Sequence, residues 1–159
     1  MKFQPALQIA QNLFLVGNKV ISYETHVATL QFYPKELRRR PVLTTKGKYS
    51  RTTTKHIHRV RQLLDASLVD HQIVPLHRQA FYQFEFGAQC KIPGSISPAG
   101  SSQIMEQLKL GNPIDVAVAV VASTLPKPDL KKILAMTDSL PDLYTRIQRC
   151  MFLRDKGLA

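Results

Sequence analysis

The stretch Lys46-Gly-Lys-Tyr-Ser-Arg-Thr-Thr-Thr-Lys-His-Ile-His-Arg-Val-Arg61 holds a dense positive charge, two histidines and the clearest helix start in the chain. Its three consecutive threonines carry hydroxyl groups of the kind that cap helices, and we expect the cap among them. Apolar residues follow at helical spacing, at Ile57, Val60, Leu64 and Leu68. The pattern predicts a helix over about residues 53–67 with one apolar face.

The residues before this helix have the composition of β-strands. Residues 20–23, 26–33 and 42–45 are rich in β-branched and aromatic side chains, which favour strands. Gly17-Asn18 is typical of a tight turn, and the basic residues 35–40 are expected to form a connection. Farther upstream, a proline and apolar residues at roughly helical spacing predict a short helix over residues 4–13.

Two further strands are expected after the central helix, over residues 71–76 and 79–86. These elements predict an α+β fold in which a small, mostly antiparallel sheet packs against the helix, followed by a C-terminal helical region. Residues 93–100 are rich in proline, glycine and serine and predict a linker or long loop. The expected organisation is therefore a basic α+β region over 1–92, this linker, and a helical region over 101–159.

Helical patterns dominate the last third of the chain. We expect helices over residues 101–110, 129–138 and 139–154, with Gly111 ending the first. Residues 114–123 are ambiguous because their valines alternate as in a strand, whereas the Asn112-Pro113 flank favours a buried helix. The apolar surface of these helices is mainly core, and any surplus would serve a homo-oligomer or a partner protein.

Charge is distributed very unevenly along the chain. Residues 1–64 carry 12 Lys and Arg against 2 Glu, a net of +10, whereas residues 65–159 carry 10 against 9, a net of +1. An even distribution would suit solubility alone, but this asymmetry indicates a binding face for a polyanion. Nucleic acid is the first expected partner, and an acidic protein is the alternative.

Several function classes lack support in the sequence. It has no Walker A, Rossmann or Gly-x-Ser-x-Gly motif, and its 2 cysteines cannot form a Cys-rich metal site. The basic half has too few carboxylates for a two-metal nuclease. We therefore expect no cofactor and no metal. No apolar run would span a bilayer or direct secretion, which predicts a cytoplasmic protein that does not enter membranes.

The helix start predicts phosphate contacts, because backbone N–H groups and the positive end of the helix dipole would face an anion there. Tyrosines 23, 33 and 49 are candidates for stacking on unpaired bases, although tyrosines in strands more often belong to a core. The candidate nucleic-acid-binding residues are Arg38, Arg39, Arg40, Lys46, Lys48, Arg51, Thr53, Lys55, Arg59 and Arg61.

The histidines support a second, weaker hypothesis. His56 and His58 lie about 200° apart on the predicted helix, so they cannot share a metal ion. Either one would serve as a general acid or base in a metal-free nuclease, with His26 as the best-placed second histidine. The alternative is that these histidines are surface residues or nucleic-acid ligands, and more of the pattern favours a protein that is not an enzyme.

Two segments resemble a group of uncharacterised proteins encoded by phages and plasmids. These are Val20-Ile-Ser-Tyr-Glu-Thr-His-Val-Ala28 and Tyr49-Ser-Arg-Thr-Thr-Thr-Lys-His-Ile57, which match Ser-Tyr-x-Thr-x-Val-Ala and Tyr-Ser-x-Thr-Thr-x-Lys-His patterns. The resemblance covers about residues 18–60. It implies a mobile-element origin and gives no functional residues, because that group has no established activity.

Overall fold

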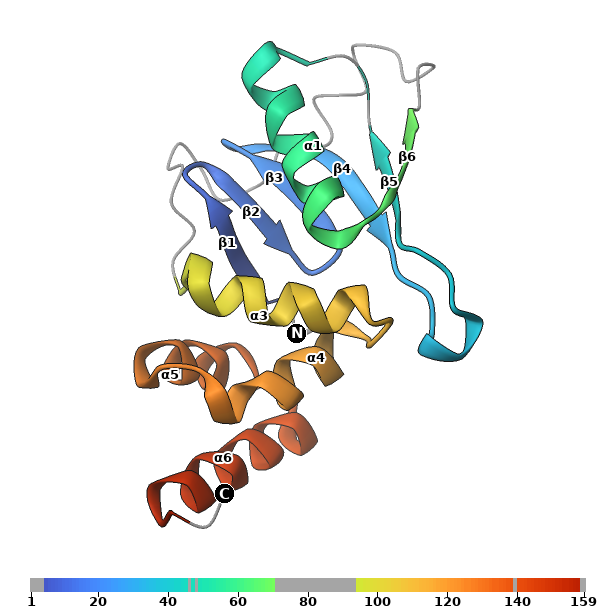
Figure 1. The fold of residues 1–159 in the computed structure, drawn as a ribbon. Helices are drawn as coiled ribbons and strands as arrows, with labels where there is room; N and C mark the ends of the chain where they lie inside the picture. The colour runs from blue at the N-terminus through green and yellow to red at the C-terminus, as the bar shows by residue number, and fades with distance from the viewer. Residues whose placement is uncertain (1–4, 46, 48, 71–93, 139, 158–159) are drawn as a thin grey trace.

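The computed structural model describes residues 5–157 except 46, 48, 71–93 and 139 (Figure 1). Within these residues a six-stranded sheet has the strand order β1-β2-β3-β4-β5-β6. The strands are β1 Ala6–Ala10, β2 Leu13–Val16, β3 Lys19–Ser22, β4 Thr25–Gln31, β5 Val42–Thr45 and β6 Ser67–Asp70. The sheet is antiparallel except for the β5–β6 pair, and helix α1 (Arg51–Leu64) packs on one face. The expected α+β class is confirmed.

The first four strands form a meander of tight hairpins. Gly17 has φ 62° in the β2–β3 turn, as the Gly17-Asn18 pair predicted. The helix predicted over residues 4–13 was wrong, because this segment contains β1. Leu7 pairs with Leu15 of β2 and belongs to the core cluster that also contains Ile9. Side chains two residues apart share one face of a strand, so cross-strand burial outweighed an imperfect helical spacing.

Helix α1 connects the parallel strands β5 and β6. It begins two residues earlier than expected because Ser50, rather than a threonine, is the cap: the Ser50 hydroxyl accepts from the Thr53 N–H at 3.3 Å. It ends at Leu64, and Asp65 follows with φ 49°. Leu68 therefore lies on β6 and is 39% exposed, instead of continuing the helical stripe. The strands predicted over 71–76 and 79–86 lie outside the described residues.

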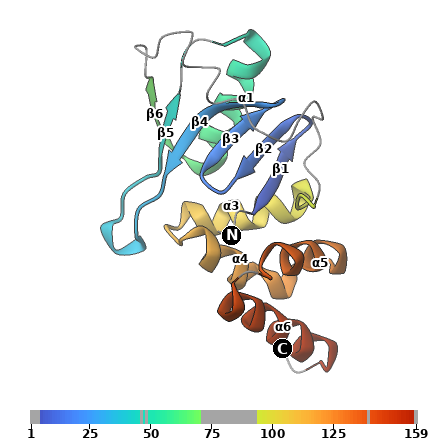
Figure 2. The ribbon, with the colours of Figure 1, turned by 180° about the vertical axis from the view of Figure 1, so that it is seen from behind.

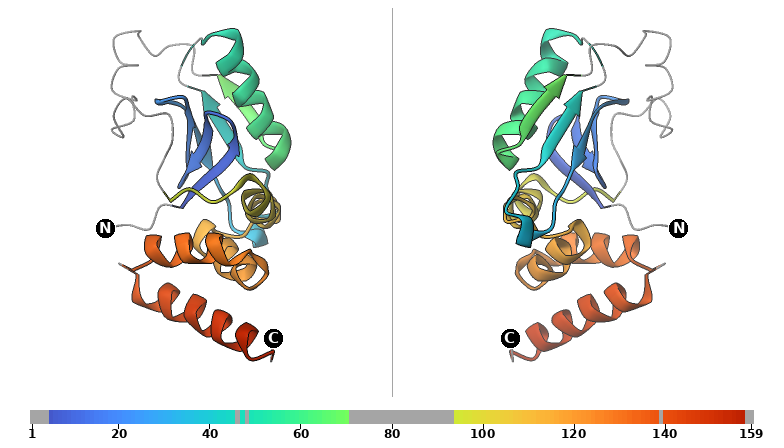
Figure 3. Two further views of the ribbon diagram at one scale, coloured as in Figure 1. Left: turned by 90° about the vertical axis from the view of Figure 1, so that its left-hand side faces the viewer. Right: turned by 90° about the vertical axis from the view of Figure 1, so that its right-hand side faces the viewer.

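The C-terminal helices are α3 Pro98–Lys109, α4 Ile114–Val121, α5 Lys127–Met136 and α6 Pro141–Asp155. The helical interpretation of residues 114–123 is confirmed, and Gly111, with φ 86°, follows the C-cap of α3. Helix α3 begins three residues earlier than expected, because the Ser97 hydroxyl caps it and is held by the buried Asp129 carboxylate at 2.7 Å. Figure 3 shows α3 beneath the sheet, with the other helices stacked below.

One hydrophobic cluster joins the two parts of the molecule. It runs from the sheet through Ile57 of α1 and Ile104 of α3 to Ile147 of α6. On the sheet face opposite α1, which Figure 2 brings to the front, a smaller cluster contains Phe14 and Ile21. Residues 94–97 are tied to the sheet edge, where the Ile96 N–H donates to the Ala6 carbonyl at 2.7 Å. No described helix has the length and apolar character that a bilayer span requires.

Candidate nucleic-acid interface

The exposed side of α1 carries a ridge of like charges. Arg51, Lys55 and Arg59 are all exposed and follow one another at four-residue intervals, about 6 Å apart along the helix axis. The 14 residues of α1 contain no aspartate or glutamate. Like charges at this spacing destabilise a helix by a few tenths of a kcal/mol per pair, roughly 0.2–0.5. We call these three residues the α1 ridge, and its charge opposes the stability of its own helix.

The N-terminus of α1 adds a second unfavourable charge interaction to this repulsion. Its first turn contains no acidic residue, although negative charge is the favourable partner of a helix N-terminus. Arg51 instead occupies the first helical position, next to backbone N–H groups that carry a partial positive charge. The positive potential of the ridge and of the helix end therefore add, and a bound polyanion would relieve both.

A groove of about 590 Å³ lies beside the ridge, between α1 and the β1–β2 and β3–β4 turns. Its described lining contains no carboxylate. Lys55 and Arg59 belong both to the ridge and to the groove. We call this the α1 groove, lined by Ala10, Gln11, Asn12, Tyr23, Thr52, Lys55, His56, His58, Arg59 and Gln62.

His56 lines this groove and contacts Ser22 of β3. The Ser22 Oγ and the His56 Nδ1 are 2.8 Å apart, and the serine is only 2% exposed. Burial, and then the positive charge of Arg59, lower the pKa of His56 below its ordinary value of 6.5. The imidazole is therefore held in one orientation and is neutral at neutral pH.

Tyr23 lies next to His56 at the edge of the groove. The two ring centroids are 5.8 Å apart and the planes are tilted by 33°. Tyr23 has φ 57° and Asn12 has φ 60°, which places a residue of each turn in the left-handed region. This conformation is unusual for a bulky side chain. The Tyr23 N–H donates to the Asn12 carbonyl at 2.8 Å, so the two turns support each other.

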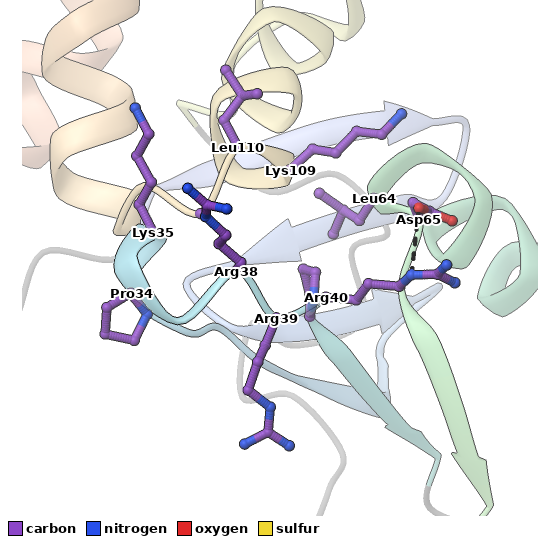
Figure 4. A pocket seen from close by; sticks show the side chains of 11 residues that line it. Pro34, Lys35, Arg38, Arg39, Arg40, Leu64, Asp65, Lys109 and Leu110 are labelled. Atoms are coloured by element: carbon purple, nitrogen blue, oxygen red, sulfur yellow. Dashed lines mark ion pairs between the residues drawn. The ribbon is translucent and has the colours of Figure 1, made fainter.

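A second basic surface lies at the other end of α1, where a pocket of about 210 Å³ is lined by five cationic residues and Asp65 (Figure 4). We call it the η1 pocket, after the short 3-10 helix η1 (Lys35–Leu37) that forms one wall. Its cations are Lys35, Arg38, Arg39, Arg40 and Lys109. Asp65 and Lys109 show that the C-terminal ends of α1 and α3 meet there.

The cations of the η1 pocket have local partners. Arg40 Nε is 3.8 Å from the Asp65 carboxylate, and the guanidinium of Arg39 lies 4.5 Å from the centre of the Tyr33 ring. Each helix C-terminus also carries about half a negative charge, which offsets nearby cations. Figure 4 shows Arg40 reaching towards Asp65 while Arg39 turns away from Arg38. The side chains therefore diverge, and part of their charge is balanced within the protein.

The predicted site residues divide among these surfaces. Arg51, Lys55 and Arg59 form the ridge, and Arg38 to Arg40 line the η1 pocket. Arg61 is exposed in the last turn of α1. Thr53 is buried, and its hydroxyl accepts from Ser22 at 3.4 Å and from Ser50 at 3.3 Å. Lys46 and Lys48 lie outside the described residues.

The histidines proposed to act together are not brought together. His56 and the exposed His58 both line the α1 groove. His26 of β4 is opposite Ile21 of β3, whose side chain belongs to the cluster on the far face of the sheet. The His26 Nε2 lies 2.9 Å from the Thr29 hydroxyl. Among the described residues, no group of three or more His, Cys, Asp or Glu side chains could hold a metal ion.

Sequence reasoning missed the groove itself. Gln11, Asn12 and Gln62 drew no attention because neutral amides in the sequence have no distinctive spacing. Lys109 was missed as a neighbour of Lys35 because 74 positions separate them. The one available sign of the turn was Asn12 after an apolar run, since asparagine tolerates the left-handed conformation of a hairpin turn.

The two segments quoted for their resemblance meet at this groove, because Ser22 and Tyr23 contact His56. No curated protein and no solved structure matches the chain. Residues 3–72 match the model of a family of unknown function (DUF8033). This range contains both segments, all six described strands and α1.

Proposed function

We propose that this protein binds nucleic acid through phosphate contacts along the α1 ridge. The observation that carries the proposal is the i, i+4 series of Arg51, Lys55 and Arg59 on a helix without a carboxylate. A surface that only kept the protein in solution would mix both signs of charge. The three cations instead oppose their own helix, and phosphates would turn this repulsion into attraction.

The η1 pocket extends this surface as a secondary contact. Arg38 to Arg40 lie at the C-terminal end of the helix whose residues 51–59 carry the ridge. A polyanion lying along α1 would meet both regions. The resemblance to phage- and plasmid-encoded proteins supports an origin in a mobile element, where nucleic acid of the host or of the element is the natural ligand.

The first experiment measures binding of labelled single-stranded and duplex DNA and RNA by fluorescence anisotropy while salt is raised about fourfold. With six or more phosphate contacts, affinity falls by about a thousandfold or more over this range. A flat salt response would contradict the proposal. The variant Lys55→Gln/Arg59→Gln should weaken binding and reduce the salt dependence.

The chain offers a matched control for this variant. Lys127 and Lys131 are exposed, lie four residues apart on α5, and are therefore a second like-charged pair on a helix. Lys127→Gln/Lys131→Gln removes the same net charge outside the proposed interface. Equal loss of affinity in the two variants would mean that net charge, and not the α1 ridge, attracts the ligand.

A metal-free nuclease is the second candidate, favoured by the 2.8 Å contact between Ser22 and His56. A neutral, oriented imidazole beside two cations is suited to accept a proton during phosphodiester cleavage. The test is cleavage of single-stranded RNA and DNA in the presence of a chelator. Absence of cleavage by the wild-type protein, or equal cleavage by His56→Ala, removes this candidate.

If no nucleic acid binds, the basic surface would serve an acidic protein partner in an assembly or inhibitory role. A pull-down from nuclease-treated lysate addresses that outcome. Light scattering, in turn, determines whether the C-terminal helices form a homo-oligomer.

A further inference from the structure

We propose that the rings of Tyr23 and His56 form a stacking site for an unpaired nucleobase, so that the α1 groove takes single-stranded nucleic acid. This inference rests on the proposed function, because the α1 ridge would hold the phosphates of the same strand. It adds a ligand class that phosphate contacts alone do not define, since phosphates are common to single strands and duplexes.

The structure distinguishes among the three candidate tyrosines. Tyr33 is half-buried and its ring lies against Arg39, while Tyr49 is packed against the main hydrophobic cluster. Tyr23 is 42% exposed and lines the groove that Lys55 and Arg59 also line. Only Tyr23 therefore combines an accessible ring with nearby cations from the ridge.

Contacts within the protein hold the backbone of Tyr23 and the ring of His56 in place. The left-handed backbone of Tyr23 is fixed by its hydrogen bond to Asn12, and the imidazole of His56 is fixed by Ser22. A left-handed tyrosine is unfavourable for the fold, and such conformations are concentrated at functional sites. Groups held in this way lose less conformational entropy when a base stacks on them.

The rest of the lining suits a nucleobase. Lys55 and Arg59 line the same groove as the two rings, so they are available to the phosphates next to a stacked base. Gln11 and Asn12 carry amide groups that both donate and accept hydrogen bonds, as base edges do. Because stacking tolerates every base, we expect weak sequence preference. A base within a duplex is already stacked and paired, so it cannot enter.

The test compares three ligands of equal length: a labelled single strand, its duplex, and a strand in which abasic sites replace the central bases. The wild-type protein should bind the single strand about tenfold or more tightly than the abasic strand. Tyr23→Asn removes the ring but keeps a residue that tolerates positive φ, so the fold is preserved. It should abolish this preference, whereas Tyr23→Phe should retain it.

The control is Phe152→Asn, which removes another exposed aromatic ring with a neighbouring cation, since Lys156 Nζ is 5.8 Å from the Phe152 ring centre. It should leave all three affinities unchanged. If the three ligands bind equally and depend on Lys55 and Arg59 but not on Tyr23, the stacking site is wrong and the phosphate interface stands. If none binds, both proposals fail.

Discussion

The α1 groove and the η1 pocket are both basic, yet their charges are held in opposite ways. In the groove, Lys55 and Arg59 belong to a ridge of like charges that no carboxylate of α1 offsets. In the pocket, Arg40 pairs with the Asp65 carboxylate and Arg39 lies over the Tyr33 ring. Two helix C-termini also supply partial negative charge there. Part of the charge in the pocket is therefore balanced by groups of the protein itself, whereas the charge of the ridge is not balanced within its helix.

This difference shows why a count of basic residues does not locate an interface. Residues 35–40 form the densest basic cluster in the sequence, but two of these cations, Arg39 and Arg40, have partners within the protein. Charge that costs stability is the better indicator of a ligand, because functional sites are where proteins keep features that are unfavourable for folding. The following predictions test whether the two surfaces differ in this way.

The largest expected effect is on affinity. Lys55→Glu/Arg59→Glu should weaken binding of a single-stranded oligonucleotide by about a hundredfold or more and lower the salt slope by about 2. Arg38→Glu/Arg39→Glu makes the same change in charge at the η1 pocket and should cost less than about tenfold. Anisotropy titrations at several salt concentrations measure both. A greater loss at the pocket would reverse the assignment of primary and secondary contact.

The next effect concerns the wall of the η1 pocket. Gly111 has φ 86°, and a Cβ built on it would lie 2.9 Å from the Lys35 Cα, so the chain passes too close for a side chain. Gly111→Ala should lower the free energy of unfolding by about 2 kcal/mol. Urea denaturation followed by circular dichroism measures this.

Binding to the α1 groove should survive Gly111→Ala whenever the protein is folded, because Gly111 contacts the η1 segment and not the groove. A control is Gly157→Ala, where φ is 69° but no atom lies within 4 Å of the added Cβ. It separates backbone strain from the steric clash. Equal destabilisation by the two substitutions would show that the close approach to Lys35 has no energetic weight.

The sequence predicted the parts of this fold in which local chemistry and tertiary packing agree. The apolar stripe of Ile57, Val60 and Leu64 and the terminating Gly111 are examples, because helical periodicity and a left-handed stop are local properties. The segment 4–13 failed because its local spacing suited a helix while pairing with β2 buried the same residues more completely. Strand pairing depends on distant residues, which spacing does not reveal.

The candidate site was predictable only in its charges. Arg51, Lys55 and Arg59 share a helix, so their spacing was visible in the sequence. The contact of Ser22 with His56 spans 34 positions and depends on how α1 lies across β3. Tyr23 resembled a core residue because its neighbours form strands, and its exposure results from the turn after Ser22. The groove could therefore be found only in the structure, which brings residues of two turns and α1 together.

A smaller effect on stability should have opposite signs at the two surfaces. Arg51→Glu places a negative charge at the start of α1, four residues before Lys55, and should raise the free energy of unfolding by about 0.5–1 kcal/mol while weakening oligonucleotide binding. Lys109→Glu puts a negative charge in the last turn of α3 and should lower the free energy of unfolding by about 0.5 kcal/mol. Denaturation curves at low salt measure both, and changes of the same sign would contradict the comparison.

The smallest effect is a dependence of stability on pH. Burial and Arg59 lower the pKa of His56 in the folded protein below 6.5, so the unfolded chain binds more protons as the pH falls below that value. The contribution of His56 is therefore present above pH 6.5 and is lost as the pH falls through the lowered pKa. Denaturation of wild type and His56→Gln between neutral and acidic pH should give curves whose difference shrinks in acid, because the two proteins differ only in this side chain. Arg59→Gln should make this loss of stability smaller, because the pKa of His56 then lies closer to its ordinary value.

A bound phosphate would raise the pKa of His56, as removal of Arg59 does, since negative charge favours the imidazolium. If oligonucleotide binding leaves the titration of His56 unchanged, the phosphates do not lie in the α1 groove.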